Sequence, residues 1–111
     1  MYQPIVLKYF KRQLKTYVKK HRDLKDSVIV ALTKFDERQN DNLGGGIYKV
    51  RLKIKSLPKG KSKSFRLIVL VLESESYLVP IAIYFKSDKD SLSKKEINDH
   101  LQSVLFELRI G

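Results

Sequence analysis

The sequence predicts a compact α+β domain with an N-terminal strand and a two-helix hairpin packed on a small antiparallel sheet, followed by a C-terminal helix. Apolar residues fall at helical spacing in the first third of the chain and again near its end, whereas in the middle they alternate with polar residues or run together. The length of 111 residues suits a single domain spanning 1–111. No internal repeat, low-complexity tract or linker divides the chain.

The N-terminal third predicts one strand and two helices. The short apolar run Ile5–Leu7 predicts the strand. Asp23 or Asp26 is a candidate N-cap of the second helix, and the two helices should form an antiparallel pair joined near Arg22. Their apolar faces are Phe10, Leu14, Tyr17, Val18 and His21 in the first helix, and Leu24, Val28, Ala31, Leu32 and Phe35 in the second.

The polar stretch 36–42 is expected to end the second helix, and Gly44–Gly46 to turn the chain into the sheet. The triple glycine lacks the spacing and the trailing Lys-Ser/Thr of a nucleotide-binding loop, so we interpret it as a turn. A strand with a period of two follows it. Its apolar positions are Tyr48, Val50, Leu52 and Ile54, and its outward positions are Lys49, Arg51, Lys53 and Lys55.

The second half of the chain predicts a hairpin and a helix. Residues 65–72 are nearly all apolar, which is typical of a central strand buried on both faces. A turn over residues 73–76 leads into a strand over 77–85, where Pro80 indicates a bulge or an edge position. Ser93 and Glu96 form a capping-box pattern. The helix that it opens has an apolar stripe of Ile97, Leu101, Val104, Leu105 and Leu108, which we assign to the core or, alternatively, to a partner interface.

Composition favours a polyanionic partner, because the chain has 23 Lys and Arg but only 12 Asp and Glu, which gives a net charge of +11. The alternative is a basic surface that only keeps the protein soluble. The absence of Cys excludes disulfides, thiolate metal ligands and a Cys nucleophile, and two His are too few for the usual zinc or Ser-His-Asp site. We therefore expect no cofactor and no metal. The N-terminal apolar run is too short for a signal peptide, and no stretch approaches a membrane span, so we expect a cytoplasmic protein without membrane contact.

The cations concentrate in one stretch, which is the candidate functional region. Between Lys49 and Arg66 there are eight Lys or Arg and no Asp or Glu. A strand with cations on one face, beside a flexible basic loop, can hold a phosphate chain, although an ordinary half-exposed strand would show a similar alternation. The lysines of the first helix form either a solvated face or a second surface for RNA or an acidic peptide.

Five short segments in series resemble the RelE/HigB toxins of bacterial type II toxin–antitoxin systems, and they are closest to the HigB-like branch with a basic Gly-Lys-Ser loop. Their order, spacing and strand positions agree with that family over about half the chain. The segments are 45–51, 59–62, 66–68, 81–87 and 92–97.

The resemblance implies a RelE-type fold, as in compact microbial RNases, and an mRNA endonuclease that acts in the ribosomal A site without metal. The ribose 2′-OH would attack the adjacent phosphate to give a 2′,3′-cyclic phosphate and a 5′-OH. The implied partners are the ribosome with its mRNA and a cognate antitoxin, through which the complex would contact operator DNA. The alternative is a non-catalytic binding protein on the same scaffold, such as a ParE-like gyrase inhibitor or an RNA-binding module.

The resemblance also assigns residues to the site. Lys49 and Arg51 occupy the positions of two basic residues that the family aims at the scissile nucleotide, and Arg66 occupies the position of an arginine that binds the phosphate. Tyr84 matches a tyrosine of the HigB-like branch, and its side chain is suited to stacking on a base or to donating a proton. Lys86 matches a basic residue near the end of the last strand. Neighbouring cations should lower the pKa of Lys49 and favour a general-base role. We expect five further lysines to contact the RNA on either side of the cleaved position: Lys53, Lys55, Lys59, Lys61 and Lys63.

Overall fold

A five-stranded sheet in the order β1-β5-β4-β3-β2 organises the fold. The computed structural model describes residues 1–52, 54 and 64–110, and only the backbone of Ile110. The strands are β1 (Gln3–Pro4), β2 (Asp41–Gly44), β3 (Ile47–Leu52), β4 (Phe65–Leu72) and β5 (Tyr77–Phe85). The helices are α1 (Lys8–Val18), α2 (Leu24–Thr33) and α3 (Lys94–Ile110), with short 3₁₀ turns η1 (Glu37–Gln39) and η2 (Glu73–Glu75).

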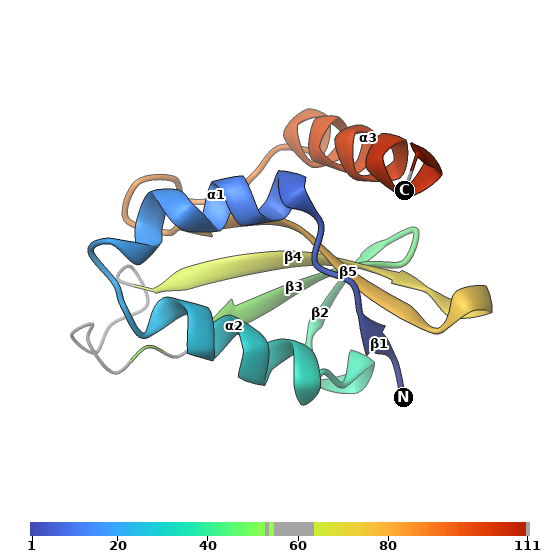
Figure 1. The fold of residues 1–111 in the computed structure, drawn as a ribbon, viewed down its shortest axis with the longest axis horizontal. Coiled ribbons are helices and arrows are strands. Elements are labelled where there is room, and N and C mark those ends of the chain that lie inside the picture. The colour runs from blue at the N-terminus through green and yellow to red at the C-terminus, as the bar shows by residue number, and fades with distance from the viewer. Residues whose placement is uncertain (53, 55–63, 111) are drawn as a thin grey trace.

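Both faces of the sheet are covered, and each has its own hydrophobic cluster. Helices α1 and α2 run antiparallel across one face, and α3 lies beside the N-terminal end of α1 (Figure 1). On the first face Phe10, Leu24 and Val28 pack against the alternate residues Val50 and Leu52 of β3. On the second face, Val104 of α3 is buried against side chains of β4 and β5, which include Ile68, Leu70, Val79 and Ile81. This arrangement confirms the α+β fold, and most of the predicted α3 stripe is only partly buried.

The predicted hairpin is confirmed over its full length, since β4 and β5 coincide with residues 65–72 and 77–85. Its turn contains Ser76 in the left-handed region, at φ 56°. The expected bulge is also present: Val69 pairs with Pro80 but Ile68 pairs with Ala82, so Ile81 is the extra residue. The side chain of Gln13 covers the edge of β5 there, accepting from the Ile83 N–H and donating to the Ile81 carbonyl, at 3.3 and 3.0 Å.

Three expectations about the N-terminal half and the sheet are wrong. The first strand is Gln3–Pro4 rather than Ile5–Leu7, because Ile5 and Leu7 pack into the cluster beneath α3. That strand runs parallel to β5, so the sheet is mixed rather than antiparallel. The polar stretch after α2 contains an additional edge strand, β2, whose four residues are all exposed and so show no hydrophobic pattern.

His21 follows the end of α1 and stacks edge-on against Phe65, with ring centroids 5.2 Å apart.

The start of α3 is fixed by the predicted capping box. The Ser93 hydroxyl accepts from the Glu96 N–H and the Glu96 carboxylate accepts from the Ser93 N–H, both at 3.1 Å. Lys89 pairs with the same carboxylate at 2.6 Å. The Lys89 contact and the Ser93 N–H lower the pKa of Glu96 from its ordinary 4.5 to about 2.

This pair predicts a pH-dependent contribution to stability. Folding depresses the pKa of Glu96, so its contribution is fully present above about pH 4.5 and is lost as the pH falls towards 2. We expect wild type to be more stable than Glu96→Gln at pH 6 and the gap to close on acidification across that window. Urea midpoints of both proteins at several pH values measure it. A gap that stays constant from pH 6 to pH 2 would contradict the account.

A carboxylate of α3 caps the N-terminus of α1 across the structure. Glu107 accepts the backbone N–H groups of Lys8 and Tyr9 at 2.8 and 3.0 Å, where Leu7 has no side chain that could do so. We expect Glu107→Ala to lower the free energy of unfolding by about 1–2 kcal/mol. Gln102→Ala, an exposed change on the same helix, is the control and should be nearly neutral. Equal urea midpoints for the two variants would show that the cap contributes nothing.

Candidate functional site

Three of the predicted site residues form one row across the second face of the sheet. Arg51 of β3 pairs with Arg66 of β4, and Arg66 pairs with Tyr84 of β5. Adjacent strands lie about 5 Å apart, so the row spans roughly 10 Å. Lys49 lies two residues before Arg51 on the same face.

The bulge at Ile81 creates this row. On the turn side of the bulge, Val69 pairs with Pro80. If the same register continued past Ile68 without a bulge, Arg66 would pair with Ile83 instead of Tyr84. A shift of one residue turns side chains to the other face, so Tyr84 would then point towards α1 and α2. The extra residue therefore brings the hydroxyl of Tyr84 to the same face as the guanidinium of Arg66.

Arg66 is a buried cation without a described carboxylate partner. It is 4% exposed, and its Nη1 donates to the Ser64 hydroxyl and, at 3.4 Å, to the Phe65 carbonyl. Among the ion pairs of the described residues, none includes Arg66. Burying a charge against neutral acceptors alone is costly, and such groups concentrate at functional sites. The site therefore favours an incoming anion.

Tyr84 is a protonated hydroxyl donor beside that cation. Its side chain is 5% exposed, which leaves little ring surface for open stacking. Burial raises the pKa of Tyr84, the charge of Arg66 opposes this rise, and Asp90 adds to it. The net shift is upward from 10.0, so the hydroxyl keeps its proton at neutral pH.

Lys49 is accessible and has one acidic neighbour. Its Nζ lies 3.9 Å from Asp41 Oδ2 on β2, and the two side chains are 28% and 57% exposed. The sequence hypothesis placed only cations around this amine, and it overlooked Asp41 because β2 was not recognised. The ion pair is long and only partly buried, so it contributes little to stability.

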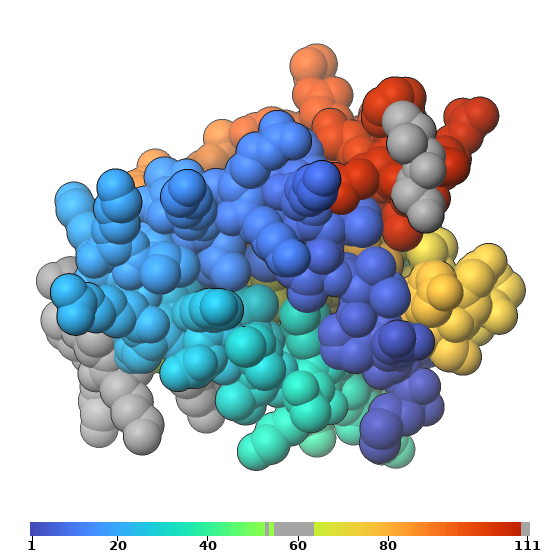
Figure 2. All heavy atoms as spheres, in the orientation of Figure 1, coloured from blue at the N-terminus to red at the C-terminus, as the bar shows by residue number. Residues whose placement is uncertain are grey.

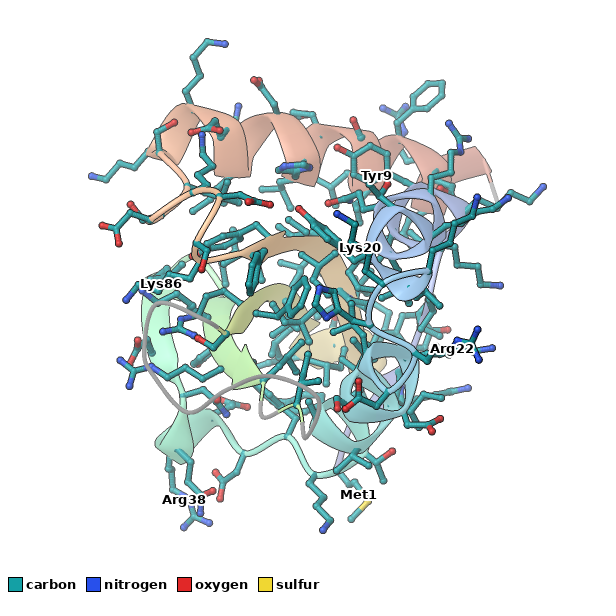
Figure 3. The ribbon with its side chains drawn as sticks, turned by 90° about the vertical axis from the view of Figure 1, so that its left-hand side faces the viewer. Met1, Tyr9, Lys20, Arg22, Arg38 and Lys86 are labelled. Carbon is teal, nitrogen blue, oxygen red and sulfur yellow. The ribbon has the colours of Figure 1, made fainter. Side chains whose placement is uncertain are left out.

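Lys86 lies just beyond β5, where its N–H donates to the Ser64 carbonyl at 2.9 Å. In Figure 3 it projects from the side of the sheet opposite to α1 and α2. Its side chain is partly exposed, and Arg51 is exposed. The predicted catalytic residues thus lie on one side of the sheet: Lys49 and Arg51 on β3, Arg66 on β4, Tyr84 on β5 and Lys86 just after β5. The predicted flanking residues Lys53, Lys55, Lys59, Lys61 and Lys63 lie outside the described residues.

A cavity of about 390 Å³ adjoins this row and extends under the first turns of α3. Tyr84 belongs to both the cavity wall and the row, and Lys49, which lies beside the row on β3, also lines the cavity. Lys94, at the first position of α3, also lines the cavity, and sequence analysis did not identify it. Lys94 lies inside the Ser93–Glu96 capping-box pattern, and that pattern indicated where the helix starts but not that Lys94 would line a cavity.

A second basic surface lies on α1, away from the sheet. Helix α1 lies on the face of the molecule shown in Figure 2. Five exposed cations follow one helical stripe along α1 and its C-cap: Lys8, Lys11, Arg12, Lys15 and Lys19. None of the ion pairs among the described residues includes them. The structure is compatible with both earlier interpretations, a solvated face and a second binding surface.

Within residues 1–52, 54 and 64–110, no three His, Cys, Asp or Glu side chains lie close enough together to hold a metal ion. No helix there is both long and apolar enough to cross a membrane.

The fold and the site define a small basic α+β protein with a row of two arginines and a tyrosine across one face of its sheet. The chain belongs to the RelE toxin family: the family model described as the RelE toxin of the RelE/RelB toxin–antitoxin system matches residues 7–105. Among solved structures, the chain is similar to a mutant of the toxin RelE from E. coli in the free state, in which two arginines are replaced by alanine. That similarity has 18% sequence identity and a TM-score of 0.47, and covers 80% of this chain and 87% of that one. A search of curated proteins gave no match.

Proposed function

We propose that this toxin-family protein is a ribosome-dependent mRNA endonuclease that inhibits translation by cutting message in the A site. The observation that carries the proposal is the row of Arg51, Arg66 and Tyr84, in which a buried cation without a described carboxylate partner lies between a second cation and a protonated hydroxyl. A phosphate is the anion that such a row fits, since guanidinium groups bind its oxygens with two donors at a time.

The proposed chemistry is attack of the ribose 2′-OH on the adjacent phosphate, which gives a 2′,3′-cyclic phosphate and releases the 5′-oxygen. Negative charge accumulates on the phosphorane, and cations already in place stabilise it more than the ground state. Arg66 and Arg51 would bind the phosphate oxygens. The 2′-OH would pass its proton to solvent water as its oxygen bonds to phosphorus. Tyr84 would donate a proton to the departing 5′-oxygen and regain one from solvent after the step; this assignment agrees with the upward shift of its pKa.

Lys49 and Lys86 would hold the nucleotide from the two sides of the row. Because Lys49 forms an ion pair with Asp41, we assign it an ammonium role at the phosphate. The general-base role inferred from the sequence depended on a purely cationic neighbourhood. The scheme requires no metal or cofactor, since these side chains supply both the charge and the proton.

The proposal extends to partners and location. A cognate antitoxin would neutralise the protein and connect the complex to operator DNA, and both would act in the cytoplasm with the ribosome. The net charge of +11 favours the RNA-rich surface of a ribosome and an acidic antitoxin segment alike.

Reconstituted translation tests the proposal directly. Purified protein is added to ribosomes halted on a defined mRNA, with the same mRNA free of ribosomes as the control. We expect cuts within the A-site codon only in the presence of ribosomes, with 2′,3′-cyclic phosphate ends. Intact mRNA, or equal cutting without ribosomes, would contradict the proposal; gyrase inhibition with intact mRNA would favour the ParE-like alternative.

Removing the acidic neighbour of Lys49 should strengthen RNA binding. We expect Asp41→Asn to raise affinity about two- to fivefold, because RNA no longer competes with an exposed ion pair worth at most about 1 kcal/mol. Asp99→Asn is the matched control, since Asp99 pairs with Lys95 at 3.3 Å on the exposed side of α3 and the net charge changes equally. Fluorescence anisotropy with a short 2′-O-methyl RNA measures both. Equal effects of the two variants would mean that overall charge, not the site, is responsible.

A further inference from the structure

The cavity beside the row is lined mainly by apolar side chains, whereas the row itself consists of two arginines and a tyrosine. Most of its lining is aliphatic, and this part comes from β2, β3, β4, α3 and the segment that precedes α3: Leu43, Ile47, Ile68, Leu92, Ile97 and Leu101. The polar lining is limited to Lys49, Tyr84, Ser91, Lys94 and Asn98, and no Asp or Glu among the described residues lines the cavity. Apolar walls with a few polar groups and a volume of about 390 Å³ are typical of a small-ligand site.

The position of the cavity limits what can enter it. Tyr84 belongs to the phosphate-binding row and Lys49 lies beside it on β3, and both line the cavity, so a chain whose phosphate occupies the row passes the mouth of the cavity. In a nucleotide chain, the unit attached to each phosphate is a sugar with a flat base. A base offers two apolar faces for the aliphatic walls and a polar edge for an amide.

We propose that this cavity is a nucleobase pocket that binds one base of the RNA next to the cleaved phosphate. Leu43 and the α3 side chains would contact the faces of the base, and the exposed amide of Asn98 would bind its edge. Lys94 would bind the phosphate on the far side of that nucleotide. The inference rests on the proposed function and deepens it, because it assigns the choice of base to α3 and β2 rather than to the cationic strands.

The charges at the pocket disfavour a protein side chain as the occupant. An apolar side chain from a partner would cover Lys49, Lys94 and Asn98 without giving their donors an acceptor, and desolvating such groups is costly. A nucleotide supplies phosphate oxygens to the lysines and an edge to the amide. Charge complementarity therefore favours RNA at this site.

Neighbouring lysines at the start of α3 provide a matched test. Lys94 lines the cavity, whereas Lys95 pairs with Asp99 and its side chain is 87% exposed. With a 2′-O-methyl RNA hexamer as the probe, we expect Lys94→Ala to weaken binding about three- to tenfold and to reduce the salt dependence by about one phosphate contact. Lys95→Ala, with the same loss of charge, should have little effect. Equal losses from the two variants would overturn the role of Lys94.

An abasic scan tests the pocket itself. The same hexamer is prepared with one abasic position at a time, and Leu43→Ala is compared with Ile29→Ala; Leu43 is 44% exposed and Ile29, on α2, is 52% exposed, so neither change should disturb the core. We expect one abasic position to weaken binding to wild type about fivefold, and binding to Leu43→Ala to be weakened much less at that position. Ile29→Ala should respond as wild type does.

The outcomes separate this inference from the proposed function. If no abasic position matters, or if Leu43→Ala behaves like Ile29→Ala, the base pocket is wrong even when wild type cuts mRNA on ribosomes. If one abasic position weakens binding to wild type and has much less effect on Leu43→Ala, but mRNA on ribosomes remains uncut, the base pocket is supported and the nuclease proposal fails. Loss of antitoxin binding in Leu43→Ala with unchanged RNA binding would assign the cavity to a protein partner and overturn the inference.

Discussion

Arg66→Ala should reduce mRNA cleavage on ribosomes at least about 10²–10³-fold, comparable to the loss of a preorganised donor to a developing anion. The guanidinium is buried between Arg51 and Tyr84 and is held by the Ser64 hydroxyl and the Phe65 carbonyl. It is therefore already oriented before RNA arrives, and little of the binding energy is used to order it.

Arg66→Lys tests the same residue without removing its charge. The ammonium group keeps the cation but cannot supply two planar donors, so we expect most of the loss to remain. Arg38→Ala is the control, because Arg38 pairs with Asp36 at 3.2 Å and its side chain is 89% exposed. Single-turnover cleavage on halted ribosomes measures the rates, and thermal melting verifies that each variant is folded. Full activity in Arg66→Lys would mean that charge alone accounts for the role of Arg66.

Phe65→Ala should lower the free energy of unfolding by about 3–5 kcal/mol. Phe65 is 0% exposed and lies at the centre of an aromatic group in which Tyr17, His21 and Phe85 have ring centroids 5.0, 5.2 and 4.9 Å away. Its removal leaves a cavity between α1, β4 and β5 that these rings cannot fill. A domain of this size is stable by only about 5–15 kcal/mol, so the variant should be marginal.

Phe106→Ala is the matched control for that prediction, since the same side chain is deleted where it is 65% exposed. We expect its unfolding midpoint in urea to stay near that of wild type. Phe65 precedes Arg66 directly, so a loosened β4 should also reduce cleavage. A stability loss below about 0.5 kcal/mol for Phe65→Ala, within the range of ordinary surface changes, would show that the ring cluster is dispensable.

The elements predicted correctly are those whose signals are local. The β4–β5 hairpin was predicted to the residue, because two nearly all-apolar runs are separated by the polar turn residues 73–76. The capping box of α3 needs residues only three positions apart. Strand β2 was missed because all four of its residues are exposed, and β1 was misplaced because its two residues carry no apolar pattern.

The candidate site was predictable as a set of residues but not as an arrangement. Alternation along β3 placed Lys49 and Arg51 on one face, and the resemblance to a toxin family added Arg66 and Tyr84. Their alignment in one row depends on where the bulge in β5 falls, and Pro80 indicated a bulge without fixing the extra residue at Ile81. Contacts such as Glu107 with Lys8, which are 99 positions apart, leave no trace in a single sequence.

Mapping mRNA ends in growing cells tests the central claim most directly, namely that the Arg51–Arg66–Tyr84 row makes this RelE-family chain a nuclease on translating ribosomes. Wild type, Arg66→Lys and Arg38→Ala are each expressed without antitoxin, and the 5′ ends of a translated message are located by primer extension. The account predicts new ends within codons of the translated region for wild type and Arg38→Ala, and few for Arg66→Lys. Growth arrest by wild type with an intact message, or unchanged ends with Arg66→Lys, would contradict it.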